Sequence, residues 1–180
     1  AAIDRLIYYA GWADKFQQIF GSINPVASAH FNFSQLDATG VVAIFAPEES
    51  PLLGLISTVA PAIVGGNTCV VLASEKYPLS AISFAEVLNS SDVPGGVINI
   101  LTGKKGELAE HFSSHMDVNA LCYFDNLPKE MKKVIDEKAA DNIKRVIKHS
   151  ITDWYNENAE SPYFITDLQE TKTTWHPVAF

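Results

Sequence analysis

The sequence of 180 residues has little cysteine and no long apolar run. Its two cysteines, Cys69 and Cys122, lie inside apolar stretches, which excludes a disulfide scaffold and a cysteine-rich zinc site. Reduced, buried thiols favour a cytoplasmic protein. The most apolar stretch, 52–64, is too short to cross a bilayer, so neither a transmembrane nor a secretory segment is predicted.

Positive charge is also scarce. There are 13 Lys and Arg residues against 21 Asp and Glu, and the formal net charge is −8. The single basic stretch, 129–148, is interspersed with acids, so we expect no nucleic-acid partner and no membrane partner. Because 47% of the residues are hydrophobic and 19% are charged, the chain is expected to fold.

Short apolar runs bounded by glycine and proline alternate with segments of helical spacing. The pattern predicts strands at 40–46, 68–72, 97–101 and 120–124, and helices at 52–63, 78–88, 107–112 and 129–140. The last helix leads to the apolar residues Ile143, Val146 and Ile147. Wholly apolar strands that alternate with helices indicate an α/β fold: a doubly wound, Rossmann-like parallel sheet with helices on both faces.

Two further segments flank this core. Helical spacing over 2–20 predicts one N-terminal helix, and 24–36 predicts an extended hairpin arm. Near the other end, 171–174 suits an exposed C-terminal strand. We therefore expect a single domain, 1–180, with an N-terminal helix and arm (1–39), a nucleotide-binding-type core (40–149) and a C-terminal tail (150–180).

Several segments in chain order resemble the aldehyde dehydrogenase superfamily. They are 8–15 (YYAGWADK), 40–47 (GVVAIFAP), 51–53, 66–68, 74–75, 78–79, 97–103 (VINILTG), 115–118 and 139–146 (AADNIKRV). In that family these segments belong to the NAD(P)-binding domain. The run 170–175 (ETKTTW) is similar to the family's last strand, which returns after the catalytic domain and helps to assemble oligomers.

The resemblance implies that the catalytic domain is missing, because only a short segment separates the two similar regions. Family members carry the nucleophilic cysteine in that domain, and neither Cys69 nor Cys122 aligns with it. Where the family has an oxyanion-stabilising Asn, this chain has Glu49, which cannot donate a hydrogen bond. The family's general-base Glu aligns with or near His149. We therefore predict no catalytic residue.

The resemblance also implies a degraded site for NAD or NADP. Glu75 matches a ribose-binding Glu of the family and Gly103 belongs to a similar segment, so these two are the candidate cofactor-binding residues. The Lys that accompanies the Glu is replaced by Leu72, and a phosphate-binding Gly-Ser pair is replaced by Asp125 and Asn126. An acid near a helix N-terminus competes with bound phosphate, so weak or lost cofactor binding is expected.

Other polar residues have two interpretations each. Glu48 and Glu49 could serve acid–base chemistry, but a solvated loop is favoured. Glu75 is either a ribose ligand or an exposed loop acid, and both remain open. His111 and His115 have the spacing of a metal pair, yet without an obvious third ligand a surface pair is favoured and no metal is predicted. Glycines such as Gly103 suggest phosphate loops, but without a GxGxxG pattern they are better explained as caps and turns.

The leading hypothesis is a non-catalytic, aldehyde-dehydrogenase-like domain with a structural or oligomerisation role. It would associate with itself, as a homo-oligomer, or with a catalytic domain of the family, and would not be active alone. The alternative is a cofactor-binding subunit or fragment of an active NAD(P)-dependent aldehyde dehydrogenase whose thiol domain comes from another chain. A third possibility is one domain of a longer polypeptide.

Overall fold

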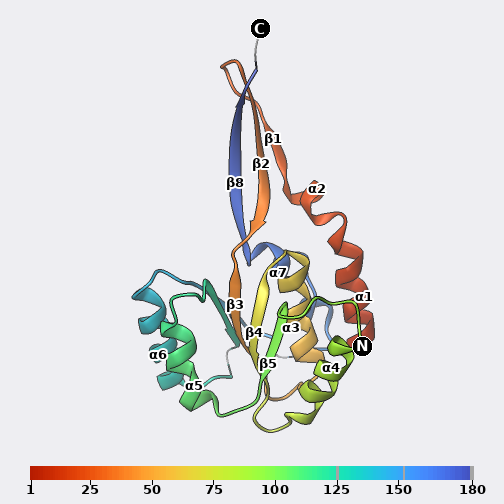
Figure 1. Ribbon diagram of the computed structural model, residues 1–180, viewed down its shortest axis with the longest axis vertical. Helices are drawn as coiled ribbons and strands as arrows, with labels where there is room; N and C mark the ends of the chain where they lie inside the picture. Colours follow the sequence, from red (N-terminus) through yellow and green to blue (C-terminus); the bar gives the residue numbers. More distant parts are fainter. Residues whose placement is uncertain (125, 152, 179–180) are drawn as a thin grey trace.

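A parallel sheet forms the centre of the molecule. The computed structural model describes residues 1–124, 126–151 and 153–178. In this part of the chain, five parallel strands lie in the order β5-β4-β3-β6-β7 (Figure 1). Their bounds are β3 Val41–Phe45, β4 Thr68–Leu72, β5 Ile98–Leu101, β6 Ala120–Phe124 and β7 Arg145–His149. The predicted Rossmann-like fold is confirmed, and the apolar residues after the last predicted helix form the fifth strand.

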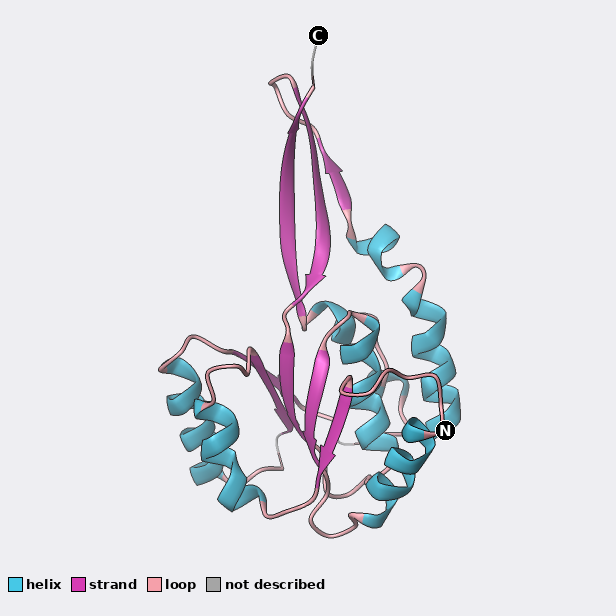
Figure 2. Ribbon diagram, viewed as in Figure 1, coloured by secondary structure: helices cyan, strands magenta, loops and turns pink. Residues whose placement is uncertain are grey.

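Helices cover both faces of this sheet (Figure 2). On one face, α3 (Leu53–Val64) and α4 (Leu79–Asn89) pack against the strands, and α1 (Ala2–Ala13) packs on α3. On the other face lie α5 (Lys105–Ser114) and α6 (Lys129–Ala140). None of the helices in the described residues is long and apolar enough to cross a membrane.

The predicted N-terminal helix is wrong in one respect, because it divides into two helices. α1 ends at Ala13, and α2 occupies Phe16–Phe20. Between them Lys15 leaves the helical backbone region, with φ −124° and ψ −18°, and its N–H bonds to the carbonyl of Trp12 at 3.1 Å. This turn brings Phe16 into a small core with Tyr9, Leu36 and other apolar residues. The gain from burying Phe16 explains the break.

A second sheet projects from the core as an arm (Figure 1). It contains β1 (Ser22–Asn24), β2 (His30–Ala38) and β8 (Gln169–Pro177), all antiparallel, in the order β1-β2-β8. The register of β2 with β8 runs from the pair His30 and Pro177 to the pair Ala38 and Gln169. The predicted arm and C-terminal strand are therefore confirmed. They pair with each other, through β2 and β8.

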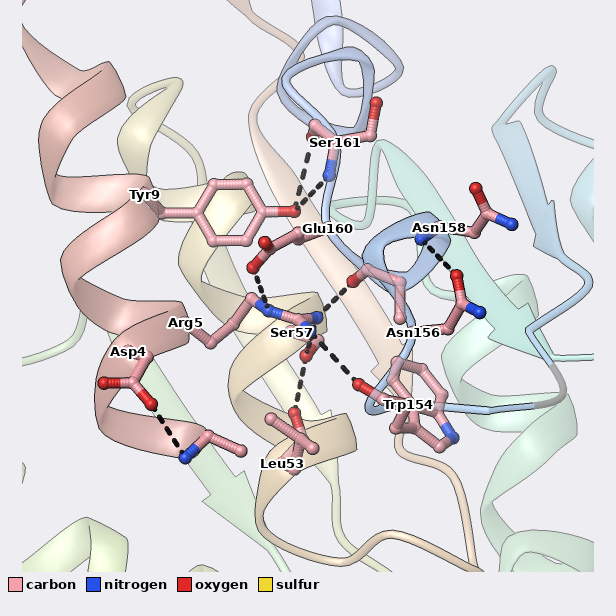
Figure 3. A network of polar contacts seen from close by, with 12 residues as sticks. Asp4, Arg5, Tyr9, Leu53, Ser57, Trp154, Asn156, Asn158, Glu160 and Ser161 are labelled. Carbon is pink, nitrogen blue, oxygen red and sulfur yellow. Dashed lines mark hydrogen bonds and ion pairs between the residues drawn. The ribbon is translucent and has the colours of Figure 1, made fainter.

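The tail between β7 and β8 is held by a buried arginine. Arg5 of α1 is 5% exposed, and its Nε lies 2.8 Å from a carboxylate oxygen of Glu160 (Figure 3). The guanidinium also donates to the backbone carbonyls of Trp154, at 3.1 Å, and Ala159, and to the hydroxyl of Ser57 at 2.7 Å. One side chain thus joins α1, α3 and the tail.

Replacing Arg5 with Ala should destabilise the protein strongly. The change removes four contacts and leaves Glu160 and two tail carbonyls without this donor, so we expect a loss of about 3–5 kcal/mol in the free energy of unfolding. Urea denaturation followed by circular dichroism measures it. The control is Asp4→Ala, whose exposed ion pair with the N-terminus should be worth less than about 1 kcal/mol. Equal effects of the two changes would contradict the assigned role of Arg5.

Candidate functional site

The carboxyl ends of the parallel strands define the candidate site. In open α/β sheets, ligands bind in the crevice beyond these ends, at the point where the strand order reverses. Here the order reverses between β3 and β6, because β4 and β5 follow on one side and β7 on the other. The loops after β3, β4 and β5 lie at this same edge, on the β3 side of the reversal, and they include Glu48, Glu75 and Gly103.

Glu48 is the centre of a cluster of polar contacts in this crevice. One of its carboxylate oxygens pairs with the ammonium of Lys105, and the other accepts hydrogen bonds from Ser74 Oγ at 2.7 Å and Lys76 N at 3.1 Å. Burial by itself would raise the pKa of Glu48, but these bonds outweigh it and lower the pKa to about 2. The carboxylate is therefore ionised at neutral pH.

Glu48 and Glu49 do not share an environment. The side chain of Glu49 is 73% exposed and forms an ion pair with Lys76 at 2.9 Å, whereas that of Glu48 is only 19% exposed. Acid–base catalysis by paired carboxylates needs one group that holds a proton near neutral pH. The lowered pKa of Glu48 opposes that role. The solvated-loop interpretation fits the exposed Glu49, but it does not fit Glu48, which is half-buried and bound to Lys105.

Glu75 lies in the loop after β4 and reaches the start of α5. Its Oε1 accepts a hydrogen bond from the backbone N–H of Lys105, the first residue of that helix. A carboxylate at this position satisfies a donor that the helix leaves unpaired and interacts favourably with the helix dipole. Glu75 therefore acts as a helix cap in this structure. Its proposed contact with a ribose remains a prediction.

Gly103 lies in the exposed turn between β5 and α5. A Cβ at this position would lie 3.1 Å from Leu108 Cδ1, so the turn has little room for a side chain. The cofactor role of Gly103 also remains a prediction. Leu72, which stands at the position of the family's ribose-binding Lys, is fully buried. Asp125, a further residue of the predicted phosphate site, lies outside the described residues.

Sequence reasoning missed Lys105. Its side chain is 4% exposed, and its ammonium contacts both Glu48 and the backbone carbonyl of Ala46, immediately after β3. The only signal in the sequence was its position, in a lysine pair directly after the turn at Gly103. Such a pair ordinarily indicates solvent exposure, and only Lys104 follows that rule.

Trp154, from the tail, lies where the strand order reverses. Its ring centroid is 5.1 Å from that of Phe124, the last residue of β6, in an edge-to-face arrangement. The indole also approaches Gly54 at the start of α3, where a Cβ would lie 3.3 Å from Trp154 Cε2. The indole is 7% exposed and belongs to the core cluster on the α3 face. An apolar side chain of the tail thus covers the ends of β3 and β6.

His149 ends β7 and packs between aromatic rings. Its ring centroid is 5.7 Å from that of Phe124 and 4.6 Å from that of Phe164. Burial lowers the pKa of His149, against the opposing effect of the Asp167 carboxylate. A histidine with a lowered pKa is neutral at pH 7 and is available as a base, but no thiol accompanies it in the described residues near the site.

Neither cysteine is placed for nucleophilic chemistry. Cys69 in β4 and Cys122 in β6 are fully buried, and burial raises the pKa of both thiols, to about 12 for Cys69. Within the described residues no group of three or more His, Cys, Asp and Glu side chains could hold a metal ion. His115 instead accepts a hydrogen bond from the backbone N–H of Asp117 at 3.3 Å.

The parallel sheet with helices on both faces defines the class of protein as a Rossmann-like α/β domain. The sequence model of the aldehyde dehydrogenase family matches residues 1–149. The chain therefore belongs to that family. The match ends with β7, so the tail and β8 lie beyond it.

Relatives and solved structures agree with this assignment. The chain is 36% identical over 145 residues to "Aldehyde dehydrogenase, cytosolic 1" of Elephantulus edwardii and to "Aldehyde dehydrogenase 1A1" of Homo sapiens. Both alignments cover 80% of this chain and 28% of the relative. The chain thus spans less than a third of the length of these enzymes.

Two solved structures illustrate the structural similarity. An NAD+ complex of aldehyde dehydrogenase from Bacillus cereus superposes with a TM-score of 0.75 at 27% identity, covering 82% of this chain and 29% of that one. PnpE from Pseudomonas sp. WBC-3 gives a TM-score of 0.73 at 30% identity, with coverage of 79% and 28%. An NAD(P) cofactor is therefore implied by the family.

The described residues of the crevice do not fit a dinucleotide. Glu75 is engaged in capping α5, and Leu72 offers no polar group to a ribose. The ammonium of Lys105 and the carboxylate of Glu48 lie against each other between the ends of the strands. A bound nucleotide would have to compete with each of these contacts.

Glu48→Gln should reduce stability in a pH-dependent way. Because the pKa of Glu48 falls from its ordinary 4.5 to about 2 on folding, its stabilisation is complete above pH 4.5 and disappears as the pH falls through 2. We expect Glu48→Gln to lower the free energy of unfolding by about 1–3 kcal/mol at pH 7. This loss should become smaller as the pH falls from 4.5 to 2. Urea titrations across this range measure it. Glu49→Gln, at an exposed position, is the control, and an effect of Glu48→Gln that is the same at every pH would contradict the assignment.

Proposed function

We propose that the chain is a non-catalytic, aldehyde-dehydrogenase-like domain that acts through association, with itself or with a catalytic member of the family. Its N-terminal part (1–39) and its tail (150–180) would supply the assembly surface, and the core (40–149) would carry them. The observation that supports this proposal best is the arm of β1, β2 and β8, which stands away from the core (Figure 2).

The arm has two features of an assembly surface. Among the strands that the structure describes, β8 pairs with β2 alone, so its other edge presents backbone N–H and C=O groups that a further strand can bind. Large apolar side chains are also exposed on it, with Phe31 45% and Trp175 57% exposed. Exposed edges together with aromatic residues are typical of protein–protein contacts.

The chemistry of the core supports the non-catalytic part of the proposal. Both thiols are buried and protonated, and Glu49 cannot stabilise an oxyanion. Weak or absent NAD(P) binding is part of the same proposal. A cytoplasmic location agrees with the reduced cysteines and with the cytosolic relative named above.

Changes on the arm should dissociate the assembly. We expect the double variant Phe31→Asp/Trp175→Asp to shift the mass measured by light scattering from oligomer to monomer, because each carboxylate would be buried in the interface. The far-ultraviolet circular dichroism should not change, since both side chains are exposed. Tyr155→Asp, at an aromatic residue 78% exposed outside the arm, is the matched control. An oligomer that survives the double change would exclude the arm as the assembly surface.

The alternative function is a cofactor-holding subunit of an active aldehyde dehydrogenase, motivated by Glu75 and the intact fold. It predicts binding of NAD or NADP near the micromolar range, weakened at least about tenfold by Glu75→Gln. The non-catalytic proposal expects weak or absent binding, well above the micromolar range in Kd, and no effect of that change. Calorimetric titration with each cofactor decides between them, with Glu49→Gln as the control at a neighbouring exposed acid.

A further inference from the structure

We propose that the chain fills its own nucleotide crevice: the Lys105–Glu48 ion pair occupies the place that the adenosine half of a dinucleotide would take. The inference rests on the proposed loss of cofactor binding and gives that loss a specific cause. It concerns residues of the loops and α5 alone, and it does not depend on how the chain assembles.

The path of the Lys105 side chain carries the inference. The residue begins α5, directly after β5, yet its ammonium reaches the carbonyl of Ala46 and the carboxylate of Glu48, both just beyond β3. In the sheet order β4 lies between β5 and β3. The side chain therefore crosses the carboxyl end of β4 and ends beside β3, one of the two strands between which the order reverses. Ligands of open α/β sheets bind at this edge, outside the carboxyl ends of the strands.

Burial and further hydrogen bonds hold the Lys105–Glu48 pair in place. Lys105 is 3% exposed, and Glu48 also accepts bonds from Ser74 and Lys76 of the loop after β4. The loops after β3 and β4 and the start of α5 thus meet at one carboxylate. A ligand that entered here would separate the buried ammonium of Lys105 from the half-buried carboxylate of Glu48, and a buried charge without a partner is strongly unfavourable.

The charges around the pair also oppose a nucleotide. The ammonium of Lys105 is neutralised by Glu48, and that of Lys76 by Glu49. Glu75 adds a further carboxylate at the start of α5, where a helix N-terminus would otherwise attract a phosphate. The phosphate of an adenosine nucleotide would therefore approach carboxylates, and the two lysines beside them are already paired with acids.

The variant Lys105→Ala/Glu48→Gln tests the inference by removing both members of the pair. AMP is the probe, because it represents the half of the dinucleotide that this part of the crevice could hold. In calorimetric titrations to about 5 mM AMP, we expect no saturable heat from the unchanged protein and binding at least about tenfold tighter from the double variant. Lys104→Ala, at the exposed neighbouring lysine, should behave as the unchanged protein.

The outcomes separate the inference from the proposed function. Binding of AMP and NAD by the unchanged protein would overturn both the loss of cofactor binding and its cause. A folded double variant that gains no affinity would overturn only the inference. A gain in the Lys104→Ala control equal to that of the double variant would also overturn it, because the effect would then not depend on the pair.

A second measurement uses the unchanged protein and does not require the variant to fold. Lysines are labelled with an amine-reactive ester and the extent at each position is read by mass spectrometry. A buried, paired ammonium reacts slowly, so Lys105 should be labelled at least about tenfold more slowly than Lys104. Equal rates at the two neighbouring lysines would show an open crevice and would overturn the inference.

Discussion

The central sheet must be covered on both faces, and this constraint shapes the rest of the molecule. Helices α5 and α6 cover one face, and α3 and α4 cover part of the other. Near β6 and β7 the tail completes the cover, with Trp154 and Leu168 in the same core cluster as the strands. Where such a segment with little regular structure packs on the core, its backbone carbonyls need hydrogen-bond partners. Arg5 resolves this conflict, because one guanidinium donates to two of those carbonyls and pairs with Glu160 (Figure 3).

The same tail fixes the arm to the core. Immediately before β8, the carbonyl of Leu168 accepts a hydrogen bond from Asn67 at 3.0 Å, and Gln169 donates to the carbonyl of Gly65 at 3.0 Å. Both partners lie in the turn that ends α3, where Gly66 adopts a φ of +87°. This turn therefore has two functions: it ends a core helix and it positions the first residue of β8. The arm can present its free edge in a defined direction because its base is anchored at buried amides.

Most of the fold could be predicted from the sequence because apolar runs of this kind have few alternatives. The four predicted strands agree with the structure to within a residue or two, and the helix predicted at 129–140 has the observed bounds. β7 was not identified as a strand, since Arg145 and Lys148 give it the polarity of an edge. The break at Lys15 was missed because no local residue forbids a helix there. It depends on the burial of Phe16 against distant residues, which sequence spacing does not reveal.

The site was predictable in its location and less so in its chemistry. Glu48, Glu75 and Gly103 were placed correctly in loops at the ends of strands, but a contact such as that between Glu75 and the N–H of Lys105 depends on the spatial order of strands that are not adjacent in sequence. Polar groups in a crevice must be satisfied by a ligand, by water or by one another. In this chain Lys105 and Glu48 satisfy one another, and each contact that stabilises the loops in this way is one that a cofactor would have to replace. The same few polar groups can therefore stabilise the loops or bind a nucleotide. In this chain they stabilise the loops.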